Sequence, residues 1–129
     1  MLLKGSPISV VLPAVDINRA KSFYTQKLGL SMMDMPVPDD SAAFECGNGT
    51  MLYIYQREEG TKAEHTAATW LVEDIDQVVK DLTKKGVTFE QYNLPDLKTN
   101  ELGIADNDGA RSSWFKDSEG NILSVTELA

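Results

Sequence analysis

Side chains that can bind a metal ion or attack a substrate are scarce in this chain of 129 residues, which has one histidine and one cysteine. A tightly held divalent ion needs several imidazole or carboxylate ligands, and His65 supplies only one. Asp106 and Asp108 stand close together, but Arg111 occupies the position where a calcium-binding loop of this kind requires glycine. We therefore interpret Asn107-Asp108-Gly109 as a turn, and we predict neither a metal ion nor any other cofactor.

Nucleophilic catalysis and nucleotide binding also lack the residues that they require. The chain has no serine in an elbow motif and no glycine-rich loop for phosphate groups. Cys46 falls at the edge of a predicted hairpin, where we interpret it as a small packing residue and not as a nucleophile. With one cysteine no internal disulfide can form, and we expect a cytoplasmic location.

Composition and charge exclude further classes of partner. Twenty acidic residues against twelve basic ones give a net charge of −8, which repels the phosphate backbone of nucleic acids. No apolar run approaches the roughly 18 residues that a membrane-spanning helix needs. The first residues, MLLKGSP, are too few and too weakly apolar for a secretory signal. We expect a soluble domain whose partner is a small organic molecule.

Two segments repeat the same succession of parts, and these elements must position any site. Ser9–Gly29 and Ala67–Gly86 each contain a strand, an aspartate that caps a helix (Asp16 and Asp74), an amphipathic helix and a final glycine that stops it. The hairpins that follow also match, because GTMLY after the first repeat aligns with GNILS after the second. A duplicated module is therefore predicted.

The repeat divides the chain into two modules within a single domain, residues 1–129. The first module spans residues 8–56, residues 57–64 form a polar linker, and the second module spans residues 65–128. Each module reads as one strand, one helix and three more strands. Residues 93–109 have no counterpart in the first module, and we predict a long loop there, with residues 87–92 as the strand before it.

These repeated parts resemble the vicinal oxygen chelate superfamily, which includes glyoxalase I, extradiol dioxygenases, fosfomycin-resistance enzymes and bleomycin-resistance proteins. The segments that carry the resemblance are Val15-Asp16-Ile17 with Phe23-Tyr24 and Leu28-Gly29, then Val72-Glu73-Asp74-Ile75, and finally Trp114–Asn121. The last segment is close to the family's F-x-D-P-D-G-N signature, with Ser118-Glu119 in place of proline and aspartate. The resemblance implies an α+β fold in which two tandem βαβββ modules form curved mixed sheets around a cup.

The resemblance also implies four positions in the cup where metal-using members carry their ligands. In this sequence they are Ser9, Tyr53, Ala67 and Ser124, and the repeat pairs Ser9 with Ala67 and Tyr53 with Ser124. Hydroxyl groups and a methyl group do not form a ligand set for a divalent ion. These residues argue against glyoxalase I or dioxygenase activity.

Strand alternation indicates what fills the cup instead. If the four positions face inward, so do Val11, Met51, Tyr55, Thr69, Ile122 and Thr126. We predict a ligand-binding wall with apolar, aromatic and hydroxyl groups, made of Ser9, Val11, Tyr53, Tyr55, His65, Ala67, Thr69, Trp114 and Ser124. Alternatively these side chains pack on one another and close the cup. The other strand faces form the core: Val10, Leu12, Leu52, Ile54, Trp70, Leu123 and Val125.

Three functions remain open at this point. The first is a metal-free protein that sequesters a small organic molecule, close in logic to the bleomycin-resistance type. The second is a lyase, isomerase or dioxygenase of the same superfamily with a relocated metal site. The third is an antitoxin-like or regulatory partner without a ligand. We also expect a homodimer, because members of the superfamily often complete the cup with a second chain.

Overall fold

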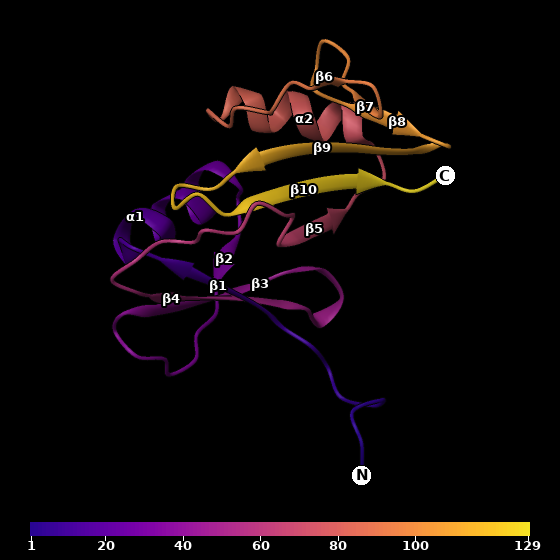
Figure 1. Cartoon of the computed structure of the whole chain (residues 1–129). Helices are drawn as coiled ribbons and strands as arrows, with labels where there is room; N and C mark the ends of the chain where they lie inside the picture. The colour runs from indigo at the N-terminus through magenta and orange to yellow at the C-terminus, as the bar shows by residue number, and fades with distance from the viewer.

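The computed structural model describes residues 1–129 and shows two separate four-stranded sheets (Figure 1). The first sheet has the order β1-β4-β3-β2 and contains β1 (Val10–Ala14), β2 (Ser31–Met32), β3 (Ser41–Glu45) and β4 (Met51–Gln56). β1 runs parallel to β4, and the remaining pairs are antiparallel. A short 3₁₀ turn, η2 (Gly47–Gly49), connects β3 to β4.

The second sheet repeats this arrangement with the order β5-β10-β9-β8. Its strands are β5 (Ala68–Leu71), β8 (Ala105–Asn107), β9 (Ala110–Lys116) and β10 (Ile122–Glu127). β5 is parallel to β10, as β1 is to β4. A separate hairpin contains β6 (Asn93–Leu94) and β7 (Leu97–Lys98). The α+β fold with mixed sheets that the sequence predicted is confirmed, and residues 57–64 contain no helix or strand.

The helices begin and end at the predicted residues. The carboxylate of Asp16 accepts from the amide of Arg19 at the start of α1 (Ile17–Ser22), and Asp74 accepts from Gln77 at the start of α2 (Ile75–Lys84). The first helix continues as a π-helical turn, η1 (Phe23–Lys27). Gly29 (φ 74°) and Gly86 (φ 97°) adopt the left-handed conformation that ends a helix. Neither helix is long and apolar enough to cross a membrane.

The duplication extends to individual contacts at the strand ends. The amide of Ile17 donates to the side-chain oxygen of Gln56 at 3.2 Å, and the amide of Ile75 donates to the carboxylate of Glu127 at the same distance. Gln56 and Glu127 occupy equivalent positions at the ends of β4 and β10. Each module therefore ties the start of its helix to the end of its last strand.

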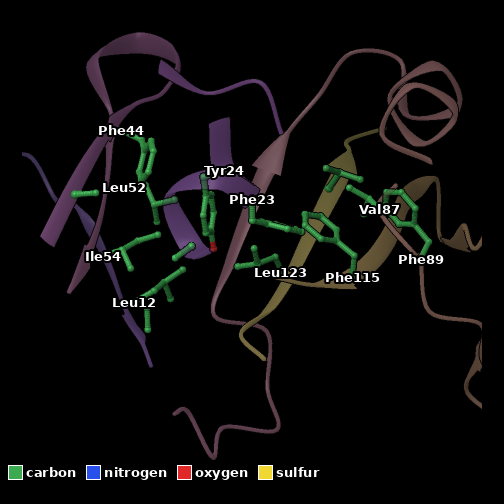
Figure 2. Packing of buried hydrophobic residues seen from close by; sticks show 14 of the residues in the cluster. Leu12, Phe23, Tyr24, Phe44, Leu52, Ile54, Val87, Phe89, Phe115 and Leu123 are labelled. Carbon is green, nitrogen blue, oxygen red and sulfur yellow. The ribbon is translucent and has the colours of Figure 1, made fainter. Parts of the chain in front are cut away.

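One hydrophobic core joins both modules, and the first helix lies inside it. Figure 2 shows Phe23 and Tyr24 between Phe44 and Leu52 of the first sheet and Phe115 of the second. All five belong to a single cluster of 18 buried residues. The sides of the two sheets that carry the helices therefore face one another, and the opposite sides face outward.

Most of the predicted core residues lie in this cluster. Leu12, Leu52, Ile54, Leu123 and Val125 are buried, and Trp70 packs against them partly buried. Val10 is the exception at 37% exposure, because it is the first residue of β1 and lies beyond the buried cluster that covers Leu12 and Ala14 of the same strand. Cys46 also packs against the cluster, as predicted for a small packing residue.

The second module departs from the predicted strand pattern. Residues 93–109, predicted as a loop, contain β6, β7 and β8, while residues 87–92, predicted as a strand, make only an isolated bridge from Phe89 to Phe115. The reason lies at the edge of β9. β8 turns back through Asp108 and Gly109, both at positive φ, and pairs with the first half of β9, which leaves only its far end for Phe89. The predicted turn at Asn107-Asp108-Gly109 is confirmed.

Candidate functional site

The outward side of the first sheet carries three of the nine predicted ligand-binding residues: Val11, Tyr53 and Tyr55. Val11 of β1, Tyr53 of β4 and Ala43 of β3 stand side by side in the strand register. Tyr55 follows two residues later on the same side. Val11 is 54% exposed and both tyrosines are half-buried, whereas Ala43 is buried at their base. We call this surface the first outer face: Val11, Ala43, Tyr53 and Tyr55.

The outward side of the second sheet carries three more of them: Thr69, Trp114 and Ser124. Ser124 of β10 stands between Thr69 of β5 and Trp114 of β9 in the register. Beside them, the hydroxyl of Thr126 lies 3.2 Å from that of Thr69 and 2.8 Å from that of Ser112. We call this surface the second outer face: Thr69, Ser112, Trp114, Ser124 and Thr126. It offers a row of linked hydroxyl groups beside an indole ring.

The residues inserted in the second module add a wall to the second outer face. A pocket of about 260 Å³ lies among β7, β8 and β9, with Trp114 and Ser112 on one side and Asp96, Lys98 and Asp106 around it. Both charge signs border it, and its lining contains apolar as well as polar residues. Such a mixed lining suits an organic ligand with a flat apolar body and polar substituents.

Two contacts hold the indole ring of Trp114 in place. The ring of Tyr92 meets it edge to face, with 5.8 Å between the ring centroids. The indole N–H donates to the hydroxyl of Thr66 at 3.2 Å. Partial burial, with a smaller effect from Glu90, raises the pKa of Tyr92, so its hydroxyl stays protonated at neutral pH. The ring of Trp114 is therefore a fixed wall that a ligand can stack against.

The structure brings the predicted site residues together in two groups and keeps the groups apart. Val11, Tyr53 and Tyr55 share the first outer face, and Thr69, Trp114 and Ser124 share the second. Since the core lies between the sheets, the two faces point away from each other. Ser9 and His65 are exposed and precede their strands, while Ala67 is half-buried and its amide donates to Ile122.

The metal that the superfamily's name implies does not match these residues. The four implied positions, Ser9, Tyr53, Ala67 and Ser124, provide three hydroxyl groups and a methyl group, divided between two faces. Elsewhere in the chain, no three histidine, cysteine, aspartate or glutamate side chains converge as a metal ion would require. The donor groups of this chain therefore do not fit a divalent ion.

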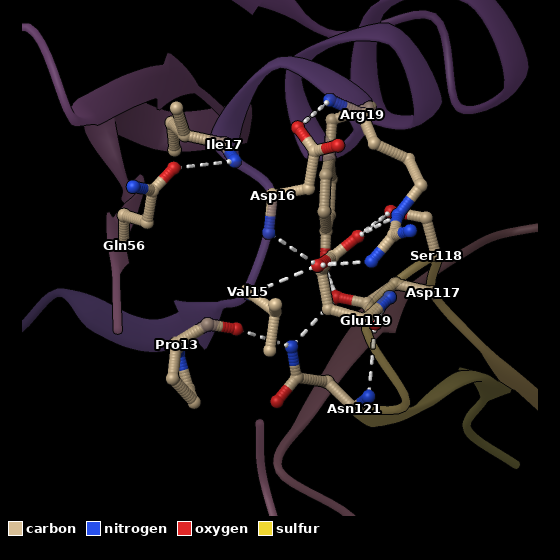
Figure 3. A network of polar contacts seen from close by, with 11 residues as sticks. Pro13, Val15, Asp16, Ile17, Arg19, Gln56, Asp117, Ser118, Glu119 and Asn121 are labelled. Atoms are coloured by element: carbon tan, nitrogen blue, oxygen red, sulfur yellow. Dashed lines mark hydrogen bonds and ion pairs between the residues drawn. The ribbon is translucent and has the colours of Figure 1, made fainter. Parts of the chain in front are cut away.

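A buried carboxylate that the sequence analysis did not single out locks the modules together. Glu119, in the turn between β9 and β10, accepts hydrogen bonds from the amides of Val15 and Asp16, both at 2.9 Å (Figure 3). Arg19 of α1 adds two charge-assisted bonds, at 2.7 Å from Nε and 3.0 Å from Nη2. The side chain of Glu119 is completely buried, whereas that of Arg19 is half exposed. We call these contacts the Glu119 clamp.

Asp117 and Asn121 of the same turn complete the junction. The carboxylate of Asp117 accepts from the hydroxyl of Tyr24 at 2.6 Å and from the side-chain amide of Asn121 at 2.7 Å. The side-chain amide of Asn121 also donates to the carbonyl of Pro13 at 3.0 Å. The segment that most resembled the family signature is therefore a structural junction. The spacing of Asp117, Glu119 and Asn121 is the sequence feature that could have pointed to this junction. It does not reveal which residues they contact.

The pKa shifts agree with this structural role. Burial favours the neutral form of Glu119, but the bonds from Arg19, the Asp16 amide and Ser118 outweigh it and lower its pKa to about 2. Burial, together with the nearby charge of Asp117, raises the pKa of Tyr24 well above its ordinary value. Glu119 is thus ionised and Tyr24 protonated at neutral pH, and neither is poised to exchange protons with a substrate.

Comparison with known proteins identifies the fold. The family model described as the Glyoxalase/Bleomycin resistance protein/Dioxygenase superfamily matches residues 7–125. A lactoylglutathione lyase from Agrobacterium tumefaciens is similar at 22% identity, with a TM-score of 0.67 over 96% of this chain and 95% of the other. A glyoxalase family protein from Bacillus anthracis is similar at 19% identity, with a TM-score of 0.72 over 100% and 99% of the two chains.

A third solved structure extends the range of similar folds. UcmS2 is 20% identical, with a TM-score of 0.73 over 95% of this chain and 98% of its own. No curated protein matches the sequence. At such low identities the similarity to solved structures establishes the fold alone.

Proposed function

This chain belongs to the Glyoxalase/Bleomycin resistance protein/Dioxygenase superfamily, and we propose that it is a small-molecule-binding protein that holds an organic ligand without a metal ion. The composition of the outer faces supports the proposal. Tyr53 and Tyr55 on the first face, and Trp114 on the second, offer aromatic rings for stacking, and the hydroxyl groups around Thr126 offer hydrogen bonds. The absence of a converging ligand set favours binding over metal-assisted catalysis.

We further propose that two copies of the chain complete each binding site. One chain turns its outer faces in opposite directions, so a ligand on one face cannot reach the other. In a homodimer, the first outer face of one copy can lie opposite the second outer face of its partner. Every ligand would then contact Tyr53 from one chain and Trp114 from the other.

The edges of the sheets support this assembly. β1 and β5 are the edge strands next to the outer-face positions, and each has one side without a hydrogen-bonded neighbour. Val11 at 54% and Leu71 at 67% exposure are large apolar side chains on these strands. Unpaired edges with exposed apolar residues favour association with another chain.

Ligand binding is tested by titrating planar aromatic compounds, with and without a positive charge, such as 9-aminoacridine and its neutral analogue acridine. We expect at least one to quench tryptophan emission with saturation, and Tyr53→Ala to weaken it by about tenfold. Glu64→Ala, an exposed change outside both faces, serves as the control. If none saturates, or if Tyr53→Ala behaves like the parent chain, the faces are packing surfaces only.

The metal-free state is tested by elemental analysis of untagged, dialysed protein. We expect far less than one zinc, nickel, iron or manganese ion per chain, and no change in melting temperature with a chelator, because no converging donors hold an ion. Near-stoichiometric metal with His65 among the ligands would instead support a lyase, isomerase or dioxygenase with a relocated site.

A further inference from the structure

A second cavity lies in the seam between the modules, on the side of the sheets that carries the helices. Its volume is about 160 Å³, and all eight residues that line it are hydrophobic. Leu28 and Leu30 border it from the end of the first helix, Val78 and Leu82 from α2, and Trp70 from β5. Since the outer faces look away from this seam, the cavity is separate from the proposed site.

The lining residues are held in place by the fold. Gly29, at φ 74°, turns the chain sharply between Leu28 and Leu30, and the amide of Leu30 donates to the carbonyl of Tyr24 at 3.0 Å. The ring of Trp70 stacks on that of Phe115 with 6.4 Å between centroids. The cavity is therefore a consequence of how the end of the first helix meets the second module.

The chemistry of the lining restricts what the cavity can hold. A water molecule needs two to four polar partners, and the lining offers none. The cavity is partly open to solvent, and its volume is close to the roughly 150 Å³ of enclosed apolar cavities that bind molecules of the size of benzene. The bordering side chains Leu28, Val78 and Leu82 are only partly buried, so a ligand can enter without global unfolding.

We propose that this cavity binds a small nonpolar molecule with a single ring or a short branched chain. The lining gives it no hydrogen bonds, so shape and apolar contact determine selectivity. This inference does not rest on the dimer or on the outer faces.

The test uses Trp114→Phe protein, in which Trp70 is the only remaining tryptophan. Iodobenzene is titrated because its iodine atom quenches indole emission at close range. We expect saturable quenching, weakened about tenfold by Val78→Met, which extends a side chain into the cavity. Lys80→Met places the same side chain on the exposed surface of α2 and should bind like the parent. Tyr53→Ala should also leave this binding unchanged, which separates it from the outer-face site.

Quenching that rises linearly without saturation, or that is equal in Val78→Met and Lys80→Met, overturns the proposal. Melting curves confirm that each variant is folded before titration. If Val78→Met does not fold, Leu82→Phe takes its place, with Lys80→Phe as its control, because Leu82 lines the same cavity from the next turn of α2 and phenylalanine is larger than leucine.

Discussion

The two sides of each sheet differ in how much of their apolar surface a single chain buries. On the helix side, Leu12 and Leu123 are 3% and 0% exposed and belong to a core that joins both modules. On the outward side, Val11 and Leu71 are 54% and 67% exposed although they sit next to core residues in the same strands. The helix sides therefore account for folding, and the outer faces remain available for a ligand or a second chain.

Polar groups divide in the same way. The helix side contains the Glu119 clamp and the bonds of Asp117 with Tyr24 and Asn121, and no buried side-chain polar atom in the chain lacks a partner. The outer faces contain hydroxyl groups and rings beside a pocket of about 260 Å³. The family-like turn at residues 117–121 therefore stabilises the seam between the modules, while less distinctive residues form the candidate site.

Removing the Glu119 carboxylate should have the largest effect on the seam. Glu119→Ala leaves the amides of Val15 and Asp16 without an acceptor and Arg19 without its ion pair. We expect the free energy of unfolding to fall by about 4 kcal/mol in urea denaturation. Glu64→Ala, on the exposed linker, should change it by less than about 0.5 kcal/mol. Equal effects in the two variants would contradict the role of the clamp.

Substitutions of two neighbouring residues on β1 compare the helix side and the outward side of the first sheet most directly. Leu12→Ala empties part of the core and should cost about 3 kcal/mol in the same measurement. Val11→Ala, one residue earlier on the outward side, should cost less than about 0.5 kcal/mol in the monomer. A large loss for Val11→Ala at low protein concentration would show that the outer face is buried within one chain.

Acid should weaken the seam through Glu119. Its pKa is about 2 in the folded chain, below the ordinary value of 4.5, so the unfolded state takes up a proton first as the pH falls. The stabilisation of the folded chain by ionised Glu119 is complete above pH 4.5 and is lost between pH 4.5 and pH 2. We expect it to amount to about 2 kcal/mol, reduced by solvent around the exposed Arg19. Stability measured against pH should decline less steeply in Glu119→Gln, and parallel curves would contradict this assignment.

The duplicated helix caps should give smaller and similar effects. Asp16→Ala and Asp74→Ala each remove one bond from the first turn of a helix, to Arg19 and to Gln77 respectively. We expect a loss of about 1 kcal/mol for each by thermal denaturation, and recovery of most of it with serine in either place. A negligible effect in one variant would show that the two modules do not use their caps alike.

The sequence was sufficient to predict the parts that local rules determine. The caps Asp16 and Asp74 and the turn at Asn107-Asp108-Gly109 follow from local rules, and the burial of Leu12 and Leu123 follows from strand alternation. The strands β6, β7 and β8 were missed because they are two or three residues long and carry no periodic pattern. Residues 87–92 have the composition of a strand, but β8 takes most of the edge that they would pair with.

The sequence could predict the residues of each outer face, but not how the two faces are arranged. Alternation correctly groups Tyr53 with Val11, and Ser124 with Thr69, on shared faces. It does not determine whether the two modules meet through these faces or through their helices, because both arrangements need the same pattern of apolar residues. The contacts that decide the matter, from Glu119 to the amides of Val15 and Asp16, lie about a hundred residues apart in sequence.

Mixing two variants tests the shared binding site most directly. Tyr53→Ala damages the first outer face and Trp114→Ala damages the second, so each variant alone should bind the best aromatic probe weakly. After the two chains are unfolded and refolded together, a heterodimer contains one intact site and one doubly altered site. Calorimetric titration should then recover about a quarter of the parental sites at parental affinity. If the mixture binds no better than either variant alone, each site lies within one chain and the account is wrong.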